Sequence, residues 1–101
     1  MNRGEVWLVD LGYSGKVRPL LILSVQPGTQ DRALVSYVIR TTRVRGSNDE
    51  VPHQARGMKS GAFDAQGLGT TDRSHFIRRL GQLDEATLAL VEGRVRAWLA
   101  F

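Results

Sequence analysis

The chain has 101 residues, the usual size of one domain, so we expect a single domain over residues 1–101. Its composition, 42% hydrophobic and 24% charged, is typical of a soluble globular protein, and the lack of cysteine excludes a disulfide framework and a thiolate metal site. The net charge of +4 favours a polyanionic partner, of which nucleic acid is the commonest.

The chain contains no stretch that approaches the roughly 18 apolar residues of a membrane span. Its first residues also lack the apolar run of a signal peptide. We therefore expect a cytoplasmic protein with no membrane partner.

Residues 4–11 are rich in β-formers and predict the first strand, with Glu5, Trp7 and Val9 on one face. A turn-rich loop over residues 12–15 follows. Together these segments open a chain of short strands joined by tight turns, the pattern of a small antiparallel barrel or a strongly bent sheet.

The segment GKVRPLLILS, residues 15–24, places an arginine before a proline and an unbroken apolar run. A run without polar alternation predicts a strand buried on both faces, here over residues 18–25. Pro19 suits the start of a strand and favours an extended backbone at Arg18. Arg18 then lies at the lip of the core, either as an ordinary solvated charge or as a planar donor for a phosphate.

Residues 33–44 predict the third strand, apolar in its first half and basic in its second. A period of two sets Tyr37, Ile39, Thr41, Arg43 and Arg45 on one side if no bulge interrupts the strand. Thr41 is then either a common strand former or a hydroxyl beside guanidinium groups, an arrangement that contacts phosphate. A basic stripe extends from this strand and contains Arg40, Arg43, Arg45, Arg56 and Lys59.

The next elements are weaker in the sequence. Residues 50–53 contain a proline and predict a short edge strand, and residues 62–68 predict another short strand. A turn is expected over residues 69–74, with Thr71 and Asp72 as possible caps, and one helical turn over residues 75–79.

The last element is the clearest helix. Asp84 is an N-cap candidate, and apolar residues recur at helical spacing along one face. The apolar positions are Leu88, Val91, Val95 and Trp98. Trp98 and Phe101 are large apolar groups on a terminal segment, and they require burial either against the barrel or against a partner.

Few residues can do chemistry. His53 and His75 are each more typical of bystanders than of bases, and the chain lacks the common metal and nucleotide motifs and any clustered carboxylates. A reaction without metal or cofactor is therefore the simplest one available. RNA cleavage by its own 2′-hydroxyl is such a reaction, since it needs in-line geometry, a cation and proton transfer.

Several segments follow one another in a fixed order: RGEVWLVDL, KVRPLLILS, VSYVIRTTRVRG followed by EVP, GTTDRSHFIRRLGQL and DEATLALVEGRVRAWL. In order and spacing they resemble the MazF/PemK family of toxin–antitoxin ribonucleases over nearly the full chain. The resemblance implies an SH3-like β-barrel with a C-terminal helix, usually a homodimer. It also implies a sequence-selective, metal-independent endoribonuclease for single-stranded mRNA, neutralised by a cognate acidic antitoxin.

The catalytic arginine and threonine of that family fall on Arg18 and Thr41. We expect RNA-binding roles for four further residues: Lys16, Arg43, Arg45 and Gln66. Two departures from the family concern proton transfer. The loop GYSGK is shorter than usual and lacks a histidine that some members use as a base, and Gln66 replaces an acidic residue. A neutral amide cannot act as a base, so proton transfer falls either to Arg18 with Thr41 or to Asp64.

Two other functions are compatible with the sequence. Members of the same barrel superfamily bind and poison DNA gyrase without cutting nucleic acid, and Trp98 with Phe101 would suit a protein target. An RNA-binding module without activity is the third possibility, consistent with Gln66.

Overall fold

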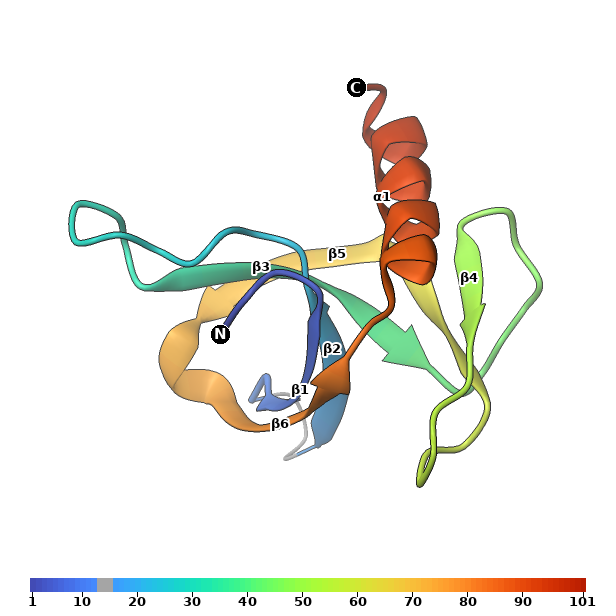
Figure 1. Cartoon of the computed structure of the whole chain (residues 1–101), viewed down its shortest axis with the longest axis horizontal. Coiled ribbons are helices and arrows are strands. Elements are labelled where there is room, and N and C mark those ends of the chain that lie inside the picture. Colours follow the sequence, from blue (N-terminus) through green and yellow to red (C-terminus); the bar gives the residue numbers. More distant parts are fainter. Residues whose placement is uncertain (13–15) are drawn as a thin grey trace.

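The structure is a computed structural model that describes residues 1–12 and 16–101, so most of the loop expected at residues 12–15 lies outside it. Six antiparallel strands form one bent sheet in the order β4-β5-β3-β2-β1-β6, followed by a C-terminal helix (Figure 1). The strands are β1 (Glu5–Asp10), β2 (Val17–Ile22), β3 (Leu34–Thr41), β4 (Glu50–His53), β5 (Gly61–Asp72) and β6 (Phe76–Gln82). A short 3-10 helix η1 (Arg73–His75) precedes β6, and the helix is α1 (Glu85–Leu99).

The expected fold, a mainly antiparallel β structure with a C-terminal helix, is confirmed. The sheet bends like an SH3-like barrel but stays open, because β4 and β6 are its two edges. The expected edge position of residues 50–53 is also confirmed, and Pro52 is tolerated there because an edge strand leaves one ladder unmade.

The apolar run of β2 serves two cores, one on each face of the sheet. Leu21 belongs to a core under α1 that also contains Val38, Phe63 and Val91. Leu20 and Ile22 point to the other face, into a core with Val9, Val35, Tyr37 and Phe76. The run has no polar alternation because each face of β2 packs into a core. The strand ends at Ile22 rather than at the expected residue 25, and Val25 is exposed.

The helix α1 covers β4 and β5 with the predicted apolar face. Its N-cap is Asp84, whose carboxylate accepts a hydrogen bond from the Thr87 N–H at 3.0 Å. Val91 is fully buried, and Leu88 and Val95 pack beside it. Trp98 and Phe101 are not covered by the sheet and remain 51% and 91% exposed.

Two expectations for residues 69–79 are wrong. Residues 69–72 continue β5 instead of forming a turn, because they pair with residues 34–37 of β3. Residues 76–79 belong to β6 instead of a helical turn, because they pair with β1. The cap expected at Asp72 is correct for the short helix η1, where its side chain accepts from the Ser74 N–H. Thr71 caps nothing and lies in β5, hydrogen-bonded to His75.

The third strand also ends earlier than expected, at Thr41. Arg43 and Arg45 therefore lie in the following loop, and the period of two that would align them with Thr41 does not extend to them. Within the described residues, no helix is both long and apolar enough to cross a membrane.

Candidate functional site

The register of β2 and β3 brings Arg18 and Thr41 together. Leu20 pairs with Ile39, and both side chains face the core that contains Tyr37. Counting two residues outward along each antiparallel strand sets Arg18 opposite Thr41, on that same face. Pro19 follows Arg18 on β2, in the part of the strand that pairs with β1 but no longer with β3.

Arg18 and Thr41 line one cavity of about 290 Å³. Lys16 and Arg43 line it too, so the cavity gathers further cationic residues beside Arg18 and Thr41. The remaining lining residues are Pro19, Arg40 and Thr42. Of the described residues, none that lines this cavity carries a carboxylate or an imidazole. The cavity is therefore suited to an anion such as a phosphate.

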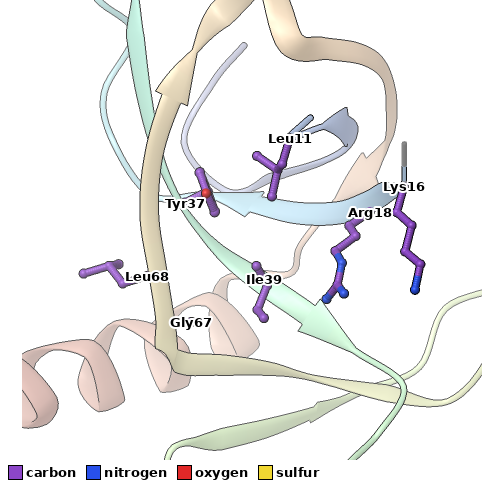
Figure 2. A pocket seen from close by; sticks show the side chains of 7 residues that line it. All are labelled: Leu11, Lys16, Arg18, Tyr37, Ile39, Gly67 and Leu68. Carbon is purple, nitrogen blue, oxygen red and sulfur yellow. The ribbon is translucent and has the colours of Figure 1, made fainter. Parts of the chain in front are cut away.

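A larger cavity of about 440 Å³ adjoins this one and shares Lys16 and Arg18 with it (Figure 2). Its other walls are largely apolar: Leu11, Tyr37, Ile39, Gly67 and Leu68. Figure 2 shows the Arg18 and Lys16 side chains side by side at one end of these apolar residues. An apolar wall with an aromatic ring is suited to stacking a base, and two cations at its end are suited to a phosphate, so the cavity has the two features that a nucleotide requires.

A break in the β3–β5 ladder shapes the larger cavity. Val38 pairs with Leu68, but the next residue, Ile39, pairs with Asp64. Residues 65–67 therefore bulge out of β5, and a bulge re-aims the side chains around it. Gln66 is exposed on this bulge and lines neither cavity. The Asp64 carboxylate accepts a hydrogen bond from the Gln66 N–H at 3.0 Å and also lines neither.

The basic loop after β3 is held by two local hydrogen bonds. The Arg43 N–H donates to Oγ1 of Thr41 at 3.0 Å, which turns the chain sharply after the strand. The Arg45 N–H donates to the Glu50 carboxylate, and hydrogen bonds from Arg45 and Ser47 lower the pKa of Glu50 despite the opposing effect of desolvation. Arg45 does not line the cavity, so only Lys16 and Arg43 of the four expected RNA-binding residues do.

Arg40 does not belong to the exposed basic stripe expected from the sequence. It is 4% exposed, and its guanidinium donates to Nδ1 of His53 at 2.9 Å and to two backbone carbonyls, those of His53 and Lys59, at 2.8 Å each. The alternation of β3 contains the signal, since Arg40 shares a face with the buried Val38. Burial lowers the pKa of Arg40.

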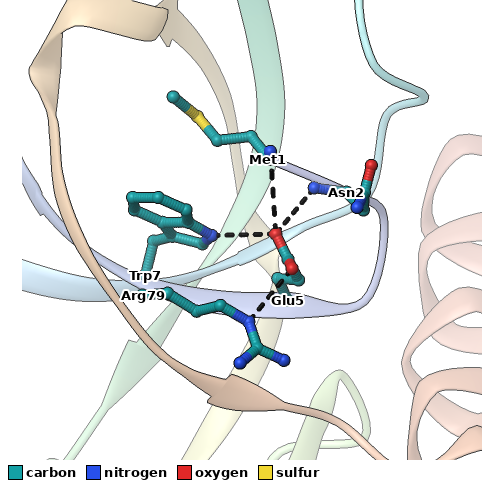
Figure 3. A network of polar contacts seen from close by, with 5 residues as sticks. All are labelled: Met1, Asn2, Glu5, Trp7 and Arg79. Atoms are coloured by element: carbon teal, nitrogen blue, oxygen red, sulfur yellow. Dashed lines mark hydrogen bonds and ion pairs between the residues drawn. The ribbon is translucent and has the colours of Figure 1, made fainter.

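A second buried polar cluster centres on Glu5 (Figure 3). Its carboxylate accepts hydrogen bonds from the Asn2 N–H at 2.7 Å, from Nε1 of Trp7 at 3.1 Å and from Nε of Arg79 at 3.0 Å. Burial raises the pKa of Glu5, but these hydrogen bonds and the positive charges of Arg79 and the N-terminal amine bring it below the ordinary value of 4.5. The cluster fastens β1 to β6 and lines neither cavity.

No three histidine, aspartate or glutamate side chains of the described part of the chain come together as a group that could hold a metal ion. The side chains that line the cavity of Arg18 and Thr41 are cations, two threonine hydroxyls and a proline, a set suited to an anion.

Comparison with known proteins gives a family and a fold. Residues 2–99 match the family described as the PemK-like, MazF-like toxin of type II toxin–antitoxin systems. No curated protein matches the chain.

Several solved structures are similar over the whole chain. An endoribonuclease from a mycobacterial species, solved in complex with its cognate antitoxin, is 26% identical, with a TM-score of 0.85 over 100% of this chain and 96% of that one. MazF from Deinococcus radiodurans is 25% identical, with a TM-score of 0.85 over 100% and 97% of the two chains. A MazE–MazF structure from the same organism gives 28% identity and a TM-score of 0.82 over 100% and 96%.

Proposed function

Because the chain belongs to the PemK-like, MazF-like toxins of type II toxin–antitoxin systems, we propose that it is a sequence-selective endoribonuclease that cleaves single-stranded mRNA. The observation that carries this proposal is the single cationic cavity lined by both Arg18 and Thr41. Such a cavity can hold a ribose-phosphate with a permanent positive charge against the phosphate and a hydroxyl beside it.

The proposed reaction is attack by the 2′-hydroxyl on the adjacent phosphorus. The 2′-oxygen loses its proton and bonds to phosphorus, the bond from phosphorus to the 5′-oxygen breaks, and that oxygen takes up a proton. The products are a 2′,3′-cyclic phosphate and a 5′-hydroxyl. Negative charge grows on the non-bridging oxygens during attack, and preorganised cations in a site of low dielectric stabilise that charge most strongly.

The residue roles follow from this charge distribution. Arg18 places its planar donors on the non-bridging oxygens, and Thr41 orients the scissile phosphate through its hydroxyl. Lys16 and Arg43 bind the flanking backbone phosphates as ordinary cations. Arg45 and Gln66 lie outside both cavities and would bind RNA that extends beyond them.

Proton transfer has two candidate routes in this chain, through Arg18 with Thr41 or through Asp64. Asp64 is engaged by the backbone of the β5 bulge, and the cavity lining offers no carboxylate. We therefore favour Arg18 with Thr41 over Asp64, with the 2′-hydroxyl proton leaving to solvent through the open cavity. A rate that rises with pH, without a bell-shaped profile, is the expected signature.

The larger cavity supports the sequence selectivity in this proposal. Tyr37 offers an aromatic face and Ile39 an aliphatic one, on which a base next to the scissile phosphate can stack. Lys16 and Arg18 end the apolar wall where the phosphate would continue.

Two partners follow from the family and its relatives. A mycobacterial relative was solved with its cognate antitoxin and a Deinococcus relative with MazE, and we propose that an acidic antitoxin covers the cationic cavity here. We also propose a homodimer, in which the exposed Trp98 and Phe101 become buried.

The test is cleavage of a mixed-sequence RNA in EDTA by wild type, Arg18→Ala, Thr41→Val and the control Arg94→Ala, which removes an exposed charge from α1. We expect wild type and the control to give cyclic-phosphate ends, the two cavity variants to be at least about a hundredfold slower, and a 2′-deoxy substrate to resist. RNA that stays intact with wild type across varied sequences would reject the proposal, and recovery of gyrase from the same preparation would then favour the gyrase-binding alternative.

A further inference from the structure

Arg40 carries a charge into the core beneath the proposed site without a carboxylate to balance it. Its three hydrogen-bond acceptors are all neutral: the His53 ring and two carbonyls. Among the described residues, no ion pair involves Arg40. A buried charge held only by neutral acceptors depends on each of them, because losing one leaves a charged donor unsatisfied.

The path of the Arg40 side chain explains why residue 61 is a glycine. Arg40 of β3 pairs with Phe63 of β5, which in turn pairs with Val51 of β4. The guanidinium crosses β5 over Gly61, where a Cβ would lie 2.7 Å from Nη1 of Arg40 and 2.6 Å from the carbonyl oxygen of Thr41. Gly61 thus leaves room for the Arg40 side chain to reach from the end of β3 to His53 on β4.

The hydrogen bond from Arg40 to His53 requires one protonation state of the His53 ring. Nε of Arg40 is a donor, so Nδ1 of His53 must be an acceptor, and the ring is neutral with its proton on Nε2. The ring is held against Phe63, with 4.7 Å between the ring centres, which fixes the direction of Nδ1. A proton on Nδ1 would remove the acceptor and place two positive charges in contact.

The charged groups around His53 come from two elements. Arg40 faces it from β3, and Asp84 faces it from the start of α1. Neighbours on β6 are uncharged: Leu80, Gly81 and Gln82. Burial and the charge of Arg40 lower the pKa of His53, against a smaller opposing effect of Asp84.

Arg40 directly precedes Thr41, and the two side chains leave β3 on opposite faces. Thr41 is the last residue of the strand, and its hydroxyl also holds the turn to Arg43. We infer that Arg40 and His53 form a clamp that positions Thr41 for RNA cleavage, and that the clamp opens when His53 takes up a proton. The inference rests on the proposed ribonuclease function only for its catalytic consequence. Arg40 is a positioning residue here, since its guanidinium does not act on the substrate.

The decisive variant is His53→Asn, because an asparagine oxygen can accept from Nε of Arg40 and does not titrate. The pKa of His53 lies below its ordinary 6.5, so we expect kcat of wild type to fall at least about twofold relative to His53→Asn as the pH drops from 7.5 to 5.0, with KM little changed. His53→Ala should have the low kcat at every pH. His75→Asn, the same substitution at the exposed second histidine, should keep the wild-type profile.

A second readout does not depend on RNA. In NMR spectra of the wild-type protein, the amide signals of Thr41 and Arg43 should shift with the same midpoint as the His53 ring, and they should stay fixed in His53→Asn. The clamp is overturned if those signals ignore His53, or if His53→Asn loses kcat in acid in parallel with wild type. Coupled signals in a protein that leaves RNA intact would reject the ribonuclease and keep the clamp.

Discussion

Gly67 on the β5 bulge lies so close to Ile39 of β3 that a Cβ at position 67 would be 2.4 Å from Cγ1 of Ile39. Real Cβ atoms do not approach other atoms this closely, so any side chain at position 67 forces Ile39 to move. Both residues line the larger cavity. The shape of that cavity therefore depends on residue 67 being a glycine.

We predict that Gly67→Ala changes RNA recognition more than it changes the phosphate site. The displaced Ile39 should weaken binding of a short single-stranded RNA and alter which sequences are cut. Overpacking at this contact should also lower the free energy of unfolding by about 1–3 kcal/mol. Quantitative binding to a panel of RNA sequences and chemical denaturation measure the two effects.

Gly93→Ala is the matched control for that experiment. Gly93 lies in α1 with nothing near the position of an added Cβ, so the same substitution should stabilise the helix by about 1 kcal/mol. RNA preference should stay that of the wild type. Equal RNA preferences in all three proteins would contradict the role given to Gly67.

Glu5 should make the stability of the fold depend on pH in the acidic range. Its pKa is below the ordinary 4.5 in the folded protein, so its contribution to stability is present above about pH 4.5 and is lost as the pH falls through the folded pKa. Glu5→Gln keeps an oxygen acceptor but not the charge that faces Arg79. We expect the stability difference between wild type and Glu5→Gln to shrink below about pH 4.5, measured by denaturation from pH 3 to 7. A difference that stays constant over this range would contradict the account.

Local patterns in the sequence predict the parts of the fold that local forces determine. The unbroken run at Leu20–Ile22 indicates a strand buried on both faces, and Asp84 indicates the start of α1; both are confirmed. The segment Phe76–Gln82 becomes a strand only because it pairs with β1, a partner distant in sequence. The apparent turn at residues 69–72 is likewise held extended by β3.

The same division applies to the site. Arg18 next to Pro19 is visible in the sequence as a charge mounted on a core strand, and the structure brings it into one cavity with Thr41. The burial of Arg40 depends on the room left by Gly61 and on an acceptor from β4. The alternation of β3 turns the Arg40 side chain inward, but neither of these groups is local to Arg40 in the sequence, so composition alone assigns it to an exposed basic stripe.

The C-terminal end of α1 should carry the dimer contact. Trp98 is half exposed and Phe101 nearly fully exposed, and burying large apolar groups of this kind is strongly favourable. We predict that Trp98→Ala shifts the protein towards monomer in sedimentation. Val25→Ala removes an exposed apolar side chain from the loop after β2 and should leave the mass unchanged. A Trp98→Ala protein that sediments like wild type would contradict this role of the helix end.

The most direct measurement is to map the 5′ ends of a long RNA after incubation with pure wild-type protein and with Arg18→Ala, in EDTA. We predict new 5′-hydroxyl ends at a recurring short sequence with wild type, and a loss of nearly all of them with Arg18→Ala while the fold is retained. The same ends appearing at the same rate with Arg18→Ala, or no new ends with wild type, would contradict a ribonuclease site built on Arg18 and Thr41.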